Sequence, residues 1–273
     1  MDFKKSYPIK DFDNRIMIEK GDSYRMAIQD KPKWGISGST LKIIAIITML
    51  IDHIGAALLE QGFIFGMSQE QLKNKIGIDV QQLDIILRMI GRVAFPIFCF
   101  LLVEGFLHTH NVKKYALRLL AFCVISEVPF DLAFFGRFNF RFQNVFFTLF
   151  LGLIVLIISK KLEDKVKGIL GIVGQILVMV IGAFLAEMLH TDYGAFGVYF
   201  IFILYFLRNQ KIFRTIMGCV SILWQGAWEI TAPLAFIPIH FYNGKRGINL
   251  KYIFYLFYPI HLMVLYMIRI LFH

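Results

Sequence analysis

The feature that most constrains this chain is a series of apolar runs, each long enough to cross roughly 30 Å of hydrocarbon as a helix. Charged residues and segments with glycine or proline separate the runs, and they predict spans at 41–59, 89–107, 115–135, 144–159, 169–189, 193–207, 213–227, 230–242 and 252–272. The composition agrees, because 58% of the 273 residues are hydrophobic and only 18% are charged. We therefore expect an all-α, polytopic membrane bundle of about nine helices rather than soluble domains.

The segment that covers the seventh and eighth spans is irregular. A sharp turn is expected at Trp228 and Glu229, and Pro233 and Pro238 interrupt helical hydrogen bonding. Residues 213–242 therefore form either two short helices or one broken helix.

The distribution of cations predicts how the bundle is oriented. The chain carries a formal charge of +10, which in a soluble protein would suggest a nucleic-acid partner. Here the cations alternate between loops, as the positive-inside rule requires. The N-terminal arm and the loops at 113–118, 160–167, 208–214 and 245–251 hold 21 of the 29 Lys and Arg residues. The N-terminus is therefore predicted to be cytoplasmic and the C-terminus to lie outside, with the lipid bilayer rather than nucleic acid as the partner.

Two regions follow from this pattern. Residues 1–40 form a basic cytoplasmic arm, in which we find no apolar stretch typical of a cleavable signal, and residues 41–273 form the transmembrane domain. The three cysteines, Cys99, Cys123 and Cys219, lie inside apolar runs without C-x-x-C spacing. Neither a disulfide framework nor a metal site is indicated.

Ionisable side chains within the spans carry the functional information, because each costs about 2.5–3.5 kcal/mol to insert and persists only with a partner or a function. Their number predicts a polar cavity within the bundle. They are Asp52, His53, Glu104, His108, Glu127, Asp131, Glu187, His190 and His261.

Helical spacing places two of these histidines at similar depth. His53 follows Lys42 by 11 residues, which places it about 16 Å deeper on nearly the same helix face. His261 lies ten residues beyond Lys251, just after Pro259. A neutral imidazole at this depth is suited to accept a proton as a general base.

The partner that orients His53 is left open among three residues. Asp52 lies about 100° away around the helix, so we expect it to pair instead with an arginine of a neighbouring span, such as Arg92. Glu104, Glu127 and His261 are the better candidates for orienting the His53 ring.

Nine motifs, in order across about residues 40–265, together resemble the TraX family of integral membrane proteins. They are LKIIAIITMLIDHIG (41–55), GRVAFPIF (91–98), EGFLHT (104–109), KYALRLL (114–120), SEVPFDL (126–132), NVFFTL (144–149), DYG (192–194), YNGKRG (242–247) and YPIHL (258–262). The family takes its name from a conjugation protein that acetylates the N-terminus of pilin. It is similar, more distantly, to transmembrane acyltransferases of the acyltransferase-3 type. Those enzymes carry a basic residue about three helical turns before a histidine, which Lys42 and His53 reproduce with lysine in place of arginine.

The resemblance implies transfer of an acetyl group from cytoplasmic acetyl-CoA to an acceptor amine or hydroxyl at the membrane or outer face. His53 would act as the general base or would itself carry the acetyl group. The other candidate catalytic residues are Asp52, Glu104, Glu127 and His261. Residues expected to hold the phosphates of CoA are Lys42, Arg118, Asn243, Lys245 and Arg246, with Gly244 and Gly247 allowing close backbone approach.

Other interpretations of the sequence stay open. The ionisable residues Asp52, His53, Glu104 and Glu127 could form the relay of a proton-coupled transporter. A membrane scaffold for assembling pili or surface polymers is a third hypothesis. For an acyltransferase, the acceptor could be a peptide N-terminus, a glycan or a lipid-linked intermediate.

Overall fold

A computed structural model describes residues 34–64, 70, 71, 74, 77, 79–249 and 251–272, together with two strands of the N-terminal arm. Strands β1 (Arg15–Lys20) and β2 (Ser23–Ile28) form an antiparallel hairpin. The sequence analysis did not predict this hairpin. From residue 38 onward the regular structure of the described chain is helical, in agreement with the predicted all-α membrane domain.

Apart from the second span, the helices lie close to the predicted spans. They are α1 (Gly38–Ile54), α3 (Val80–Gly91), α4 (Ala94–His108), α5 (Val112–Phe135), α6 (Val145–Lys165), α7 (Gly168–Met188), α8 (Gly194–Phe206), α9 (Lys211–Leu223), α10 (Phe236–His240) and α11 (Lys251–Phe272). The π-helix η2 (Gly55–Ile64) continues α1, and the short 3-10 helices η3 (Ala227–Glu229) and η4 (Ala232–Ala235) precede α10.

Five of the described helical segments are long and apolar enough to cross a membrane by length and composition. They are Gly38–Gln61, Val80–His108, Val145–Lys165, Ile169–Met188 and Tyr252–Leu271. The protein is therefore a multi-pass membrane protein. Helix α5 is of similar length but carries several charged residues, and α8 is apolar but short.

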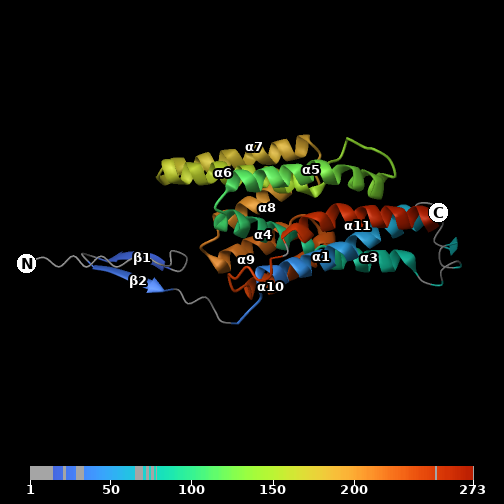
Figure 1. Cartoon of the computed structure of the whole chain (residues 1–273), viewed down its shortest axis with the longest axis horizontal. Helices are drawn as coiled ribbons and strands as arrows, with labels where there is room; N and C mark the ends of the chain where they lie inside the picture. The colour runs from blue at the N-terminus through green and yellow to red at the C-terminus, as the bar shows by residue number, and fades with distance from the viewer. Residues whose placement is uncertain are drawn as a thin grey trace, which may run out of the picture.

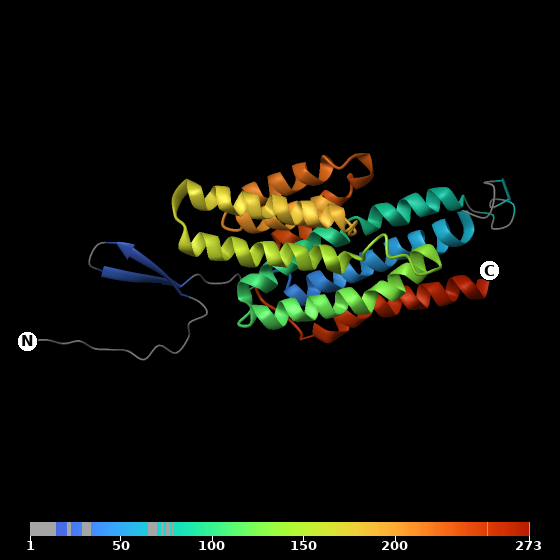
Figure 2. The same cartoon turned by 90° about the horizontal axis from the view of Figure 1, so that it is seen from above.

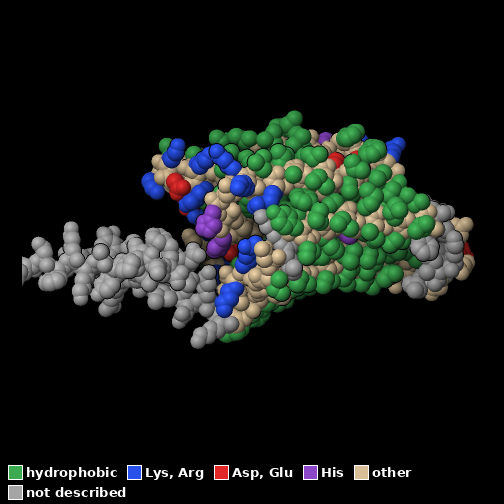
Figure 3. All heavy atoms as spheres, in the orientation of Figure 1, with side chains coloured by type: hydrophobic (Ala, Val, Ile, Leu, Met, Phe, Trp, Pro, Cys, Tyr) green, Lys and Arg blue, Asp and Glu red, His purple; other side chains and the backbone are tan. Residues whose placement is uncertain are grey.

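The bundle has two groups of helices that meet across α4 and α8 (Figures 1 and 2). Helices α5, α6 and α7 lie along one side, whereas α1, α3 and α11 lie along the other. Helix α8 packs against α4, α6 and α7, and α11 packs against both α1 and α5. Hydrophobic side chains cover the middle of the bundle surface, and Lys and Arg side chains gather at its left end in Figure 3. This end holds the loops predicted to be cytoplasmic.

The second membrane span differs from its prediction. It begins at Val80 rather than near residue 89, and α3 and α4 form one span with a break at Arg92 and Val93. Residues 80–88 lie outside the predicted span, because Gln81, Gln82, Asp84 and Arg88 make this segment polar. In the fold the Arg88 guanidinium is half-buried and paired with carboxylates of α1 and η2.

The irregular segment after α9 packs onto that break. Thr231 donates a hydrogen bond of 2.6 Å to the carbonyl oxygen of Met89, and Arg92 pairs with Glu229 at 3.3 Å. Because the break frees carbonyl groups from the helical ladder, the Thr231 hydroxyl supplies a missing partner. Residues 211–240 thus form two short helices, α9 and α10, joined by 3-10 turns. This is the first of the two predicted alternatives.

Candidate functional site

Two histidines from opposite ends of the chain meet inside the bundle. Nδ1 of His53 on α1 lies 2.7 Å from Nε2 of His261 on α11. The ring centroids are 5.0 Å apart and the planes are only 5° from parallel. With the nitrogens this close, such a centroid distance places the rings end to end in nearly one plane, which suits an N–H···N hydrogen bond. The two histidines therefore lie at one level, as predicted, and His261 is the residue that contacts the His53 ring nitrogen.

The next contact of His261 determines which nitrogens carry protons. Its Nδ1 lies 2.7 Å from the carbonyl oxygen of Phe257, and a carbonyl can only accept. In a neutral His261, Nδ1 is therefore the donor and Nε2 is the acceptor, so the proton between the rings belongs to His53 Nδ1. Nε2 of His53 is then left with a lone pair, which can accept a proton or attack a carbonyl carbon.

The charged neighbours of His53 form a separate network on the predicted outer side. Asp52 pairs with Arg88 at 2.5 Å, and Arg88 also contacts Glu60 at 3.2 Å. The expected pairing of Asp52 with Arg92 is wrong, although an arginine of the neighbouring span is the partner. Arg88 lies on the face of α3 that meets α1, whereas Arg92 lies at the break and is directed to Glu229. Asp52 thus contacts an arginine and does not orient the His53 ring.

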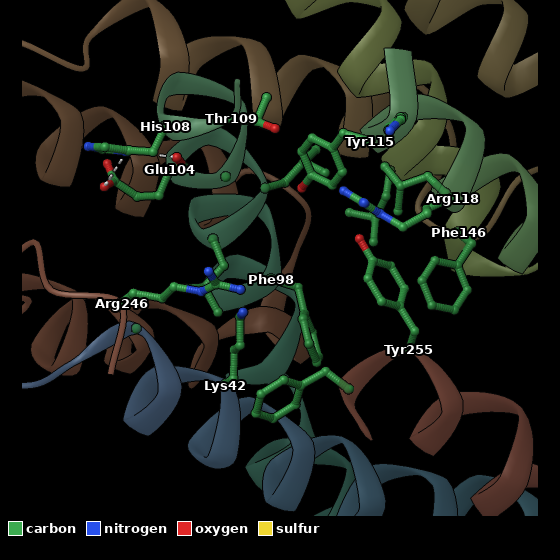
Figure 4. A pocket seen from close by; sticks show the side chains of 18 of the residues that line it. Lys42, Phe98, Glu104, His108, Thr109, Tyr115, Arg118, Phe146, Arg246 and Tyr255 are labelled. Carbon is green, nitrogen blue, oxygen red and sulfur yellow. Dashed lines mark hydrogen bonds and ion pairs between the residues drawn. The ribbon is translucent and has the colours of Figure 1, made fainter. Parts of the chain in front are cut away.

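A cavity of about 590 Å³ opens at the predicted cytoplasmic end of the bundle. Figure 4 shows Lys42 of α1 beside Arg246 of the loop before α11, and Arg118 of α5 on the opposite wall. Lys114, His108 and His110 also line the cavity. Among the described residues of its wall, Glu104 is the one carboxylate, so its electrostatic character is basic and suited to an anionic ligand.

Aromatic side chains form much of the remaining wall (Figure 4). Arg118 is hydrogen-bonded to the Tyr255 hydroxyl, and its guanidinium lies 5.9 Å from the centre of the Tyr115 ring. Lys42 lies 5.1 Å from the centre of the Phe254 ring. Flat apolar surfaces beside fixed cations are suited to a ligand that combines a planar ring with phosphates.

The inner end of the cavity stops short of the two histidines. Met49 and Tyr258 line it, and these residues lie one helical turn before His53 and His261 respectively. The Tyr258 ring centre lies 5.8 Å from that of His53 and 5.7 Å from that of His261. Tyr258 therefore separates the cavity from the histidine pair, and it is itself only 3% exposed.

The loop after α10 is fastened to the start of α1. The backbone N–H groups of Gly38 and Ser39 donate to the carbonyls of Lys245 and Arg246, at 2.8 and 2.9 Å. The Asn243 amide donates to the Gly35 carbonyl and accepts from the Lys245 N–H, so its side chain is used within this loop. Of the candidate phosphate ligands, Lys42, Arg118 and Arg246 line the cavity, whereas Asn243 and Lys245 do not.

The two glutamates proposed as catalytic residues, Glu104 and Glu127, have partners other than the histidine pair. Glu104 forms a hydrogen bond with the Tyr242 hydroxyl at the cavity wall, and its carboxylate is 3.8 Å from His108. Burial raises the pKa of Tyr242 and the adjacent carboxylate raises it further, so the phenol keeps its proton and donates it. Glu127 accepts a hydrogen bond of 2.5 Å from the Asn144 amide at the start of α6.

Sequence reasoning missed two residues of the site. Arg88 was not predicted as the partner of Asp52, and Tyr258 was named only within the YPIHL motif. The position of Tyr258, one turn before His261 and next to Pro259, was the available signal, because residues three apart on a helix share a face.

These features define a class of protein: a polytopic helical membrane protein with a basic cavity at one end of its bundle and a buried histidine pair beyond it. The family described as TraX protein matches residues 37–269, and the chain belongs to this family. It is also 30% identical over 257 residues to the probable fimbrial assembly protein FimC, serogroup H1, of Dichelobacter nodosus, a match that covers 84% of this chain and 94% of the relative. No solved structure matches the chain. The family membership expected from the nine motifs is thus confirmed, and the more distant likeness to acyltransferase-3 enzymes stays a prediction.

Proposed function

We propose that this protein is a membrane acetyltransferase that takes its acetyl group from cytoplasmic acetyl-CoA. The observation that carries the proposal is the basic, aromatic-lined cavity, which ends one tyrosine ring from a histidine whose Nε2 holds a free lone pair. The link of the family with pilin acetylation and the fimbrial relative are compatible with this role.

The cations at the cavity mouth suit the two anionic parts of CoA. Lys42 and Arg246 form one positively charged wall, and Arg118 with Lys114 forms the other (Figure 4). Coenzyme A carries a diphosphate and a separate ribose phosphate, so two cationic walls can each hold one group. Lysine acts as a point charge, whereas the arginine guanidinium can form two parallel hydrogen bonds with a phosphate.

The histidine pair supplies the proton transfer. His53 Nε2 takes the proton of the acceptor amine or hydroxyl as the acceptor attacks the thioester carbon. The tetrahedral intermediate then collapses, the C–S bond breaks, and the departing thiolate takes that proton to leave as CoA thiol. His261 holds the His53 ring through Nδ1 during both transfers. If His53 carried the acetyl group itself, an acetylated His53 would accumulate when acceptor is withheld.

The first experiment measures binding of CoA and turnover of acetyl-CoA by the purified protein in lipid nanodiscs. The wild type should bind CoA in calorimetry, and His53→Ala should keep this binding while kcat falls by about 10²–10⁴-fold. Failure of the wild type to bind either CoA or acetyl-CoA would refute the proposal.

A matched pair of variants tests the cavity. Arg118 lines the cavity, whereas Lys113 is an exposed cation on the same helix that does not. Arg118→Ala should weaken CoA binding by about tenfold or more, because a charge-assisted hydrogen bond contributes about 1.5–3 kcal/mol. Lys113→Ala should leave the affinity unchanged; equal losses in the two variants would indicate a general charge effect rather than a site.

The proton-coupled transporter hypothesis has less support from the contacts. Asp52 pairs with Arg88, Glu104 lies with Tyr242 and His108, and Glu127 is bonded to Asn144. Among the described residues these contacts form three separate sets rather than one relay. For the acceptor, the description of the relative as a fimbrial assembly protein makes a fimbrial subunit the first one to test.

A further inference from the structure

Helix α6 begins inside the bundle, where its first N–H groups need partners within the protein. Asn144, which is fully buried, precedes the helix and accepts from the Phe146 N–H at 3.0 Å, while its own N–H donates to Glu127 at 3.3 Å. The Val145 N–H donates to the hydroxyl oxygen of Tyr258. Tyr258 thus reaches from α11 to cap the start of α6.

This capping contact uses the hydroxyl of Tyr258 only as an acceptor. A phenol has one proton to donate as well, so that proton is directed away from Val145. The start of a helix carries a partial positive charge, which makes a hydroxyl held there a stronger donor. Tyr258 therefore holds a polarised O–H group, with the carboxylates of Asp192 and Glu127 as its charged neighbours.

The same side chain lies where the reacting thioester would be. Tyr258 and Val145 both line the inner end of the cavity, and the Tyr258 ring contacts both histidine rings. A linear donor such as acetyl-CoA that enters between the cationic walls would bring its acyl end to this point. The carbonyl of the acyl group would then lie within reach of the Tyr258 hydroxyl, at the end of the cavity nearest the histidine pair.

We propose that Tyr258 is a catalytic residue that donates a hydrogen bond to the carbonyl oxygen of the bound acyl group. This inference rests on the proposed acetyltransferase function. When the acceptor attacks the carbonyl carbon, the C=O electron pair moves to the oxygen, and the Tyr258 O–H stabilises the resulting oxyanion. When the C–S bond breaks, the pair returns to re-form the carbonyl. The phenol keeps its proton throughout, and His53 transfers the acceptor's proton to the thiolate.

The alternative is that Tyr258 only caps α6. Tyr258→Phe removes the cap and the proposed donor together, so its lower melting temperature alone decides nothing. Two CoA derivatives separate the capping role from the donor role. S-acetonyl-CoA and S-propyl-CoA have side chains of the same length, but only S-acetonyl-CoA carries a ketone oxygen that can accept a hydrogen bond. A pure cap would affect the binding of both derivatives equally.

We expect the wild type to bind S-acetonyl-CoA more tightly than S-propyl-CoA, and Tyr258→Phe to lose this preference. Its kcat for acetyl-CoA should fall by about 10²–10³-fold, as when one oxyanion donor is removed, while its affinity for CoA stays within about threefold of the wild type. Tyr266→Phe, which removes a hydroxyl farther along the same helix, is the control and should retain both properties.

A second variant covers the case in which Tyr258→Phe does not fold. Incorporation of 3-fluorotyrosine at position 258 keeps the hydroxyl and its bond to Val145 but makes the phenol more acidic. The preference for S-acetonyl-CoA should then increase. An unchanged preference, or a Tyr258→Phe variant with wild-type kcat, would overturn the role of Tyr258 while leaving the acetyltransferase proposal intact. Failure of the wild type to bind CoA would instead refute the proposed function itself.

Discussion

At the residue scale, the chemistry of the site depends on which nitrogen of each histidine carries a proton. The Phe257 carbonyl fixes the proton of His261 on Nδ1, and His261 in turn fixes that of His53 on Nδ1. A backbone carbonyl thereby performs the orienting role that a carboxylate often has beside a histidine. It does so without placing another charge in the membrane interior, where ionisable groups are costly.

Substitutions of His261 test this arrangement. His261→Leu leaves the Nδ1–H of His53 without an acceptor, so the ring can adopt the other tautomer, and kcat should fall by about 10²-fold or more. His261→Gln offers a side-chain oxygen to the same N–H and should recover part of the activity. Because His261 does not line the cavity, CoA affinity measured by calorimetry should be the same in both variants. Equal activity of the Leu and Gln variants would show that His261 only fills space.

The sequence predicted the histidine pair but not its immediate neighbours. His53 and His261 could be placed at one depth because both lie a known number of residues from a cation at a helix start, and helical rise converts that number into depth. The partner of Asp52 could not be fixed in this way. Arg88 and Arg92 are four residues apart, so on a continuous helix both would lie on the same face. The break at residue 92 determines that Arg88 is the one that faces α1. Tyr258 could not be singled out, because a tyrosine in an apolar span usually serves in packing.

At the scale of elements, the loop after α10 joins the start of α1 to the cavity wall. Gly247 has φ of +72°, and a Cβ atom there would collide with the Ser39 hydroxyl. This glycine therefore allows the close packing of the loop on α1. It holds the backbone that positions Arg246, one of the cavity cations.

Gly247→Ala tests this role, and the chain offers a matched control. Gly168 also has φ of +72°, but a Cβ atom there would meet nothing within 4 Å. Gly168→Ala should lose about 1–2 kcal/mol of stability from the left-handed backbone alone. Gly247→Ala should lose more, because the loop must shift, and its CoA affinity should fall by about tenfold as Arg246 is displaced. The melting temperature measures the loss of stability, and calorimetry measures the CoA affinity. An unchanged CoA affinity would show that this loop does not contribute to CoA binding.

The breaks in helices were harder to predict from the sequence than the helices themselves. The start of the second span was placed too late because Asp84 and Arg88 made α3 look like a polar loop, although the Arg88 charge is compensated by Asp52 and Glu60. Prolines did indicate the interruption after α9, since a missing N–H is visible in the sequence. The docking of Thr231 on the Met89 carbonyl joins residues far apart in the chain, and no local pattern encodes it.

At the scale of the whole molecule, the asymmetric distribution of charge predicts which side of the membrane the cavity faces. The cations of the predicted cytoplasmic loops include Lys114, Arg118 and Arg246, which line the cavity, so these residues are predicted both to orient the bundle and to attract an anionic ligand. On the opposite side, Asp52, Glu60 and Glu229 are paired with two arginines. The bundle therefore has a basic end and an end where carboxylates and arginines compensate each other.

This orientation can be measured directly with single cysteines. Lys245 and Arg141 are both exposed and lie in loops at opposite ends of the bundle, whereas Cys99 and Cys123 are buried and Cys219 is half-buried. In intact cells a membrane-impermeant maleimide should label Arg141→Cys, and it should label Lys245→Cys only after the membrane is opened. Labelling of the unsubstituted protein gives the background from the native cysteines. Acetyl-CoA is confined to the cytoplasm, so the reverse pattern would place the cavity on the outer face, where no acetyl-CoA could reach it, and the proposed reaction would then have no donor.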